Sequence, residues 1–337
     1  MRIDAINRNI NRMTSEYLDK LSERLERTNG TERLNRLYKD ECADLINRVL
    51  KDHDNTLSEG DFVKPSEIAF TDHFVAERAI LLSDGAMSRN SRLSQLIFDL
   101  YYPRTGDQTF FHYTKVSALA SILRDGFRMS PLSRNIDFHE YRTFYQDHEC
   151  LIDRRIFSED FDRIMKIMEE SYFLSLVPSK GLAEESDKLL WRNFTDHGAG
   201  VKIKIEIISD HPDFREIGYA SDKNIDRLLV NRLMKKIYEK YNRLLFITGV
   251  SRIGAFYLPG DYSSESEVRF LVKKNTDQYK FELIKKGDSY FLPHHSVYGN
   301  LTITEIIVGE NCDYDHVKDI VAASEISPEP IVSFWKG

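Results

Sequence analysis

Three short segments, "TFFHYT", "SYFLSL" and "SSESEVRFL", each place polar or ionisable side chains within an otherwise apolar, strand-like run. Their polar residues are, in chain order, His112, Tyr113, Thr114, Tyr172, Ser175, Glu265, Glu267 and Arg269. A histidine, hydroxyl groups and paired carboxylates can hydrogen-bond a ligand and can hold negative charge beside a developing positive charge. If the fold brings the three segments together, they form a candidate active site.

The third segment carries the most specific pattern. In a strand, residues two apart share a face, so Glu265, Glu267 and Arg269 are expected to project together while Val268 and Phe270 point into the core. Two carboxylates on one face repel each other unless a cation intervenes, and Arg269 could be that cation. The alternative is a solvated, charged face on a half-exposed strand.

Each segment taken alone also has an ordinary structural explanation. A single histidine in an apolar strand, such as His112, is more often a hydrogen-bonded structural residue, and Tyr172 alone is more often a packing residue. Trp191, in the helical run "DKLLWRNF", suits core packing as well as the wall of a cleft. The joint pattern of the three segments is therefore what favours a site.

Composition narrows the class of protein. The 337 residues suggest one large domain or two smaller ones, and the formal net charge of −7 argues against a surface that coats nucleic acid. A local basic groove could still be assembled from Arg124, Arg128, Arg134, Arg142, Arg154 and Arg155. The three cysteines, Cys42, Cys150 and Cys312, form no C-x-x-C pair, so neither a zinc cluster nor a disulfide framework is expected.

Several common motifs are missing from the sequence. It contains no H-E-x-x-H pair, no P-loop, no G-x-G-x-x-G and no G-x-S-x-G, so no metal site is predicted. The polar N-terminal segment does not resemble a signal peptide, and the longest apolar runs are too short to span a bilayer. We therefore expect a cytoplasmic protein with no membrane partner.

The predicted secondary structure changes near residue 106. Before it, helical spacing predicts helices over 1–28, 32–52 and about 72–101, which indicates an α-helical N-terminal extension over 1–105. After it, candidate strands occupy 109–113, 172–177, 200–207, 244–250, 267–273 and 301–309. Candidate helices occupy 115–125, 158–170, 184–195, 222–241 and 313–323. Because strands and helices mix without regular alternation, we predict an α+β domain over 106–337.

The segments "FFHYT", "ASILRDGFRMSPLSRNIDFHE", "KLLWRNFTDHGAGVKIKI", "SSESEVRFL" and "ITEIIVGENC" resemble, in that order, a widespread bacterial family of unknown function. The resemblance covers roughly residues 108–312. The chain departs from the family pattern in the loop at 135–140, which has an inserted residue, and at Phe194, where the family usually has tyrosine.

The same order of motifs is similar to the His-Tyr-Glu class of ADP-ribosyltransferases. That resemblance implies a split mixed β-sheet with flanking helices, and NAD as a substrate. It implies that His112 binds ribose hydroxyls, that Tyr172 stacks on nicotinamide, and that Glu267 holds the 2′-hydroxyl of the nicotinamide ribose and stabilises the oxocarbenium ion. Glu265 would position or deprotonate the acceptor. Further NAD contacts are expected from Tyr113, Thr114, Ser175 and Trp191.

The function that follows is an NAD-dependent mono-ADP-ribosyltransferase, of the kind found in bacterial toxins and anti-phage effectors, that modifies a protein or nucleic acid. The N-terminal helices would then bind an antitoxin or chaperone. Two alternatives stay open. One is a catalytically inactive nucleotide-sensing or partner-binding module. The other is a metal-dependent nuclease effector that uses Glu265, Glu267 and Asp137.

Overall fold

The structure is a computed structural model. It describes residues 31–74, 77–82, 92–106, 108–134, 169–220, 227–241, 244–247, 250–274 and 281–335. The predicted helix over 1–28, most of the predicted helix over 158–170 and the loop at 135–140 lie outside these residues. So do Asp137, Arg142, Arg154 and Arg155, so the structure does not describe the nuclease ligand set or the basic groove in full.

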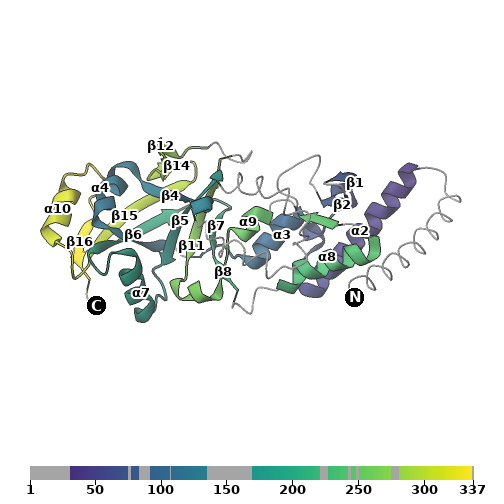
Figure 1. Ribbon diagram of the computed structural model, residues 1–337, viewed down its shortest axis with the longest axis horizontal. Coiled ribbons are helices and arrows are strands. Elements are labelled where there is room, and N and C mark those ends of the chain that lie inside the picture. The colour runs from purple at the N-terminus through teal and green to yellow at the C-terminus, as the bar shows by residue number, and fades with distance from the viewer. Residues whose placement is uncertain are drawn as a thin grey trace. The chain divides into compact units, whose positions relative to one another are not determined.

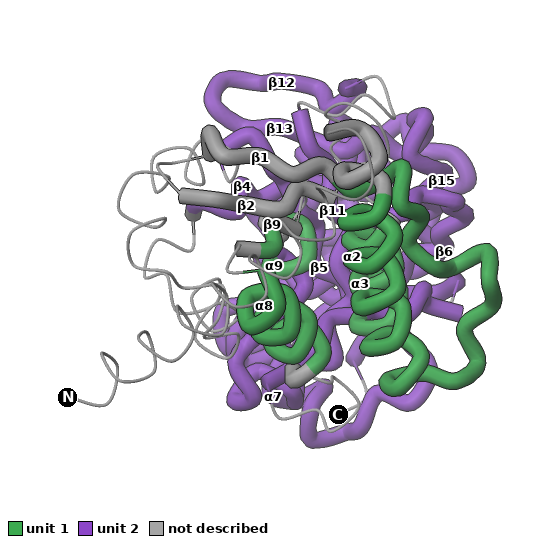
Figure 2. The backbone as a smooth tube through the Cα atoms, turned by 90° about the vertical axis from the view of Figure 1, so that its right-hand side faces the viewer, with its two compact units in different colours: residues 1–101, 144–161, 223–254 green, residues 102–143, 162–222, 255–337 purple. Residues whose placement is uncertain are grey.

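The chain divides into two compact units (Figure 2). The first unit comprises residues 1–101, 144–161 and 223–254, and the second comprises residues 102–143, 162–222 and 255–337. All of the residues expected to act in catalysis or NAD binding belong to the second unit.

The first unit combines helices with a small sheet. Its described α-helices and strands are α2 (Thr31–His53), α3 (Arg92–Tyr101), α8 (Arg227–Tyr241), α9 (Val250–Gly254), β1 (Ile68–Phe74), β2 (Glu77–Leu82) and β9 (Leu244–Ile247), and two short 3₁₀ helices, η1 (Glu59–Asp61) and η2 (Pro65–Glu67), lie between α2 and β1. Helix α2 confirms the helix predicted over 32–52 and packs on α8, with Ile46 and Leu50 fully buried. The helix predicted over 72–101 is wrong in its first part, because β1 and β2 form there and β2 pairs with the distant β9.

The second unit is built on one large sheet (Figure 1). The strand order is β12 (Ile284–Lys286), β13 (Ser289–Leu292), β4 (Phe127–Pro131), β5 (Ser171–Pro178), β3 (Thr109–Lys115), β6 (Gly200–Ile208), β15 (Gly299–Val308) and β14 (His295–Ser296). Three strands lie off this path: β11 (Val268–Lys273), β7 (Phe214–Glu216) and β16 (Ile331–Phe334). A separate two-stranded sheet joins β8 (Gly218–Tyr219) to β10 (Tyr257–Leu258). The helices are α4 (Val116–Asp125), α7 (Glu184–Phe194) and α10 (Tyr314–Ala322).

These elements confirm the predicted α+β class. The strands predicted over 109–113, 172–177, 200–207, 267–273 and 301–309 correspond to β3, β5, β6, β11 and β15. The large sheet is antiparallel except where β16 pairs in parallel with β15.

Alternating side chains give the sheet two apolar faces. On β3, Phe110 packs with α4 and α10 in the main core, while Phe111 and Tyr113 face the opposite side. There they pack with Leu190 and Trp191 of α7 in a second, smaller cluster. Helix α7 therefore covers the face of the sheet that is opposite to α4.

The sheet is interrupted along one edge of β5. Strand β11 pairs with the other edge of β5 throughout residues 171–176. On the interrupted edge, β3 pairs only with Val177 and Pro178, and β4 pairs only with Tyr172 and Phe173. Between them, residues 174–176 of β5 face a gap, which we call the β3–β4 gap.

Candidate functional site

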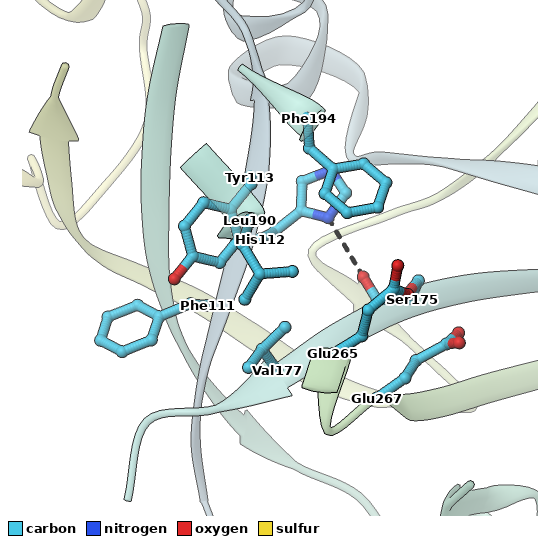
Figure 3. Close-up of a pocket in the computed structure, with 9 residues that line it drawn as sticks. All are labelled: Phe111, His112, Tyr113, Ser175, Val177, Leu190, Phe194, Glu265 and Glu267. Atoms are coloured by element: carbon cyan, nitrogen blue, oxygen red, sulfur yellow. Dashed lines mark hydrogen bonds between the residues drawn. The ribbon is translucent and has the colours of Figure 1, made fainter. Parts of the chain in front are cut away.

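A small pocket lies at the β3–β4 gap, entirely within the second unit (Figure 3). Its lining residues are Phe111, His112, Tyr113, Ser175, Val177, Leu190, Phe194, Glu265 and Glu267. Its volume of about 60 Å³ has room for a few water molecules, so it can admit a small polar group or the edge of a ring or sugar that belongs to a larger ligand. The pocket brings together residues from all three segments singled out in the sequence.

His112 fills the gap with its imidazole ring. Ser179, which follows β5, donates its backbone N–H to the Thr109 carbonyl of β3 at 3.0 Å. Backbone N–H and C=O groups alternate sides along a strand, so every second residue before Ser179, including Ser175, also directs them toward β3. The Ser175 carbonyl thus points into the gap, where His112 Nδ1 lies 3.2 Å from it. A carbonyl only accepts, so Nδ1 carries the proton and Nε2 is left as an acceptor.

The neutral state of His112 suits that role. Its ring lies edge-on to Phe127, with the two ring centroids 5.5 Å apart. Burial lowers the pKa of His112, and the hydrogen bond to Ser175 opposes this only in part. At neutral pH the imidazole can therefore accept a hydrogen bond from a ligand hydroxyl.

Glu267 is buried and held rigidly. Its two carboxylate oxygens accept from Arg269 Nε and Nη2, each at 2.9 Å, and both side chains are nearly inaccessible to solvent. Its backbone N–H donates to the Tyr219 hydroxyl at 2.8 Å. Each carboxylate oxygen retains a second lone pair, so Glu267 can still accept from a group in the pocket.

Glu265 reaches the pocket from a different element than expected. It ends a 3₁₀ helix, η5 (Gly260–Glu265), and β11 starts only at Val268. Ser266 lies between the two glutamates in the left-handed region, with φ of 47°. The prediction that Glu265 and Glu267 share one strand face is therefore wrong, although both side chains line the pocket.

A partly buried carboxylate, that of Asp187, supports the aromatic wall of the pocket. The Tyr113 hydroxyl donates to Asp187 on α7, and Lys202 Nζ lies 2.8 Å from the same carboxylate. The Trp335 indole N–H donates to the other Asp187 oxygen at 3.3 Å. Burial and the bond to Asp187 raise the pKa of Tyr113, so this hydroxyl stays protonated. Asp187 thus fixes the ring of Tyr113 at the pocket edge.

Three predicted contact residues do not line the pocket. Tyr172 lies on the opposite face of β5 from Ser175, where its ring centroid is 4.5 Å from that of Tyr290. Trp191 is buried edge-on against Tyr113, 5.8 Å between centroids, and Thr114 is partly exposed on β3. The structure therefore places His112, Tyr113, Ser175, Glu265 and Glu267 together, and Tyr172, Thr114 and Trp191 apart from the pocket.

Four apolar lining residues, Phe111, Val177, Leu190 and Phe194, were not predicted from the sequence. Phe111 is two residues from Tyr113 on β3, and Val177 is two residues from Ser175 on β5. Residues two apart share a strand face, so this spacing could have predicted both of them. Leu190 and Phe194 are four residues apart on α7 and share a helix face. Phe194 is 44% exposed, which is unusual for such a large apolar ring.

Neither a metal-ligand cluster nor a membrane-spanning helix occurs in the part of the chain that the structure describes. Within it, no group of three or more His, Cys, Asp or Glu side chains could hold a metal ion. Among the same residues, no helix combines the length and the apolar character needed to cross a bilayer.

Comparisons with known proteins identify no relative of this chain. Neither the protein-family models, nor the curated proteins, nor the solved structures yield a match to this chain.

Proposed function

We propose that the second unit is an NAD-dependent ADP-ribosyltransferase that modifies a macromolecular acceptor. One observation carries the proposal: a neutral histidine and two glutamates from segments far apart in the sequence line one pocket at an interruption of the sheet. The pocket is too small to enclose a dinucleotide, so it would contact one end of that molecule, at the nicotinamide or its ribose.

The reaction would break the bond between nicotinamide and C1′ of its ribose. Nicotinamide leaves as a neutral molecule with the bonding electron pair, and the sugar becomes a cation that the acceptor nucleophile attacks at C1′. Transition-state stabilisation then depends on negative charge held beside the sugar in a water-poor site. Glu267 supplies that charge in a fixed orientation, because Arg269 holds both of its oxygens.

The other pocket residues have complementary roles in the proposal. His112 Nε2 accepts from a ribose hydroxyl, and the Ser175 carbonyl fixes the tautomer that makes this possible. Glu265, which is partly exposed, accepts the proton of the acceptor nucleophile. Tyr172 no longer suits the stacking role, and the exposed ring of Phe194 at the pocket takes its place.

A toxin or anti-phage effector is the biological role that we propose for such an enzyme, with an antitoxin or chaperone on the N-terminal helices. A second candidate is a nucleotide-sensing module without turnover. The buried ion pair between Glu267 and Arg269 favours it, since a fully paired carboxylate has less negative charge to offer a reacting sugar.

The test is to incubate the full chain with NAD and to measure released nicotinamide and labelled acceptor. We expect Glu267→Gln to lower nicotinamide release about 100-fold or more, the usual size for the loss of one electrostatic contact to a transition state. Glu325→Gln, which changes an exposed glutamate outside the pocket, is the matched control and should keep full activity.

Because Glu267 is buried, its variant must be shown to fold and to bind NAD. Glu265→Gln is a second variant at a partly exposed position, and we expect it to retain nicotinamide release while losing acceptor labelling. Full activity of Glu267→Gln contradicts the proposal. NAD binding by the unaltered chain without nicotinamide release favours the sensing module.

A further inference from the structure

The pocket lacks a cation for an anionic ligand. Its nine lining residues include two carboxylates and neither lysine nor arginine. Arg269 contacts Glu267, yet it is buried and donates to Glu267 and to the Ala255 carbonyl. A dinucleotide carries two phosphate groups, which the carboxylates repel. A ligand of this class therefore requires positive charge next to the pocket.

Arg128 lies on the strand that borders the other side of the gap. It belongs to β4, and its neighbour Phe127 contacts the His112 ring at 5.5 Å between centroids. Ser130 of β4 lies opposite Phe173 of β5, so Arg128, two residues earlier, shares the sheet face of Phe173 and Ser175. Ser175 is one of the residues that line the pocket.

The Arg128 guanidinium is exposed, and among the described residues it makes no ion pair or side-chain hydrogen bond. Two other cations in this part of the fold already form ion pairs. Arg124 and Lys286 both pair with the buried carboxylate of Asp125, and they hold the pKa of Asp125 far below its usual range. Arg128 is thus a cation on a strand bordering the gap that is available to a ligand.

We propose that Arg128 forms an anion site at the edge of the pocket, which binds the phosphate groups of a nucleotide whose sugar or ring enters the pocket. The planar guanidinium can donate two parallel hydrogen bonds to one phosphate. That the ligand is NAD rests on the proposed function. The anion site itself requires only a phosphorylated nucleoside.

The experiment measures binding of NAD, ADP-ribose and nicotinamide riboside to the full chain by calorimetry. Nicotinamide riboside lacks phosphate groups and so cannot use the anion site. We expect Arg128→Ala to weaken NAD and ADP-ribose about 10- to 100-fold and to leave nicotinamide riboside unchanged. Arg48→Ala, which removes an exposed arginine from α2 in the first unit, is the matched control and should bind all three like the unaltered chain.

The outcomes separate this site from the proposed function. If Arg128→Ala binds NAD as tightly as the unaltered chain, or loses nicotinamide riboside equally, the anion site is wrong even where nicotinamide release persists. If ADP-ribose binds through Arg128 but NAD is never cleaved, the anion site stands and the transferase fails. If the unaltered chain binds none of the three ligands, both proposals are overturned.

Discussion

Replacing Arg269 by methionine tests the electrostatic account of the candidate site. The change removes two hydrogen bonds of 2.9 Å to Glu267, one of 2.6 Å to the Ala255 carbonyl, and a guanidinium 4.3 Å from the Phe173 ring centroid. It leaves the Glu267 carboxylate, 5% exposed, without its cation. Breaking a buried pair in this way costs about 3–5 kcal/mol.

Tryptophan fluorescence during urea unfolding reports this loss cleanly. The chain has two tryptophans, Trp191 and Trp335, and both belong to the second unit together with Arg269. The fluorescence transition therefore follows the unit that contains the site, while far-UV circular dichroism follows both units. We expect Arg269→Met to shift the fluorescence transition to lower urea.

A double-mutant cycle distinguishes the ion pair from simple loss of packing. Glu267→Leu combined with Arg269→Met removes both charges, and replacing a buried pair by apolar side chains is often close to neutral. We expect the double variant to be more stable than the sum of the single changes by about 2–3 kcal/mol. A single-variant loss below about 1 kcal/mol, or additive effects, would refute the argument that Arg269 holds Glu267 in place.

Two further changes test the local structure around the site. A Cβ at Gly126, where φ is +94°, would lie 2.1 Å from the Leu292 carbonyl oxygen, so Gly126→Ala should lower the unfolding free energy by about 2 kcal/mol or more. Gly287→Ala is the control, because its φ is +56° but no atom lies within 4 Å of the added Cβ, so it introduces only backbone strain. An equal or larger loss of unfolding free energy in Gly287→Ala than in Gly126→Ala would contradict the steric explanation. His294 donates from Nε2 to the Ile122 carbonyl at 2.9 Å, its buried Nδ1 has no partner among the described residues, and burial lowers its pKa below the usual 6.5. Its contribution to stability is therefore present above pH 6.5 and is lost as the pH falls toward the lowered pKa. Between pH 7.5 and 5.5 the urea midpoint should therefore drop less in His294→Gln than in the unaltered chain. An unchanged pH dependence would count against this assignment.

Much of the second unit could be predicted from the sequence because its strands are long and apolar. The β6 run over 200–208 and the β15 run over 299–308 are too rich in Ile and Val to be mistaken for loops. Helix α7 carries Glu184, Glu185 and Asp187 in its first turn, and at the start of α10 the Asp313 side chain accepts from His316 N–H. Local signals therefore sufficed for these elements.

Other features depend on contacts that no local pattern encodes. Strands β1 and β2 contain Ala, Glu, Arg and Leu, which favour a helix, and they form because β2 pairs with β9 far along the chain. Glu265 was placed in a strand although Gly260, Asp261 and the serines at 263–264 are typical turn formers. The resemblance to ADP-ribosyltransferases implied a site role for Tyr172, but Tyr172 and Ser175 are three residues apart on β5 and so lie on opposite faces of the strand.

The short junction between β3 and β5 has a consequence for how this pocket can diversify. The ladder between these strands consists of two residue pairs, Phe110 with Pro178 and Phe111 with Val177, so the splay of the backbone sets the width of the opening. Side chains such as Phe194 and Leu190 come from α7, outside the strand ladder. Exchanging them alters what the opening accepts without disturbing strand pairing, so related sequences can acquire new ligand preferences through a few substitutions on one helix.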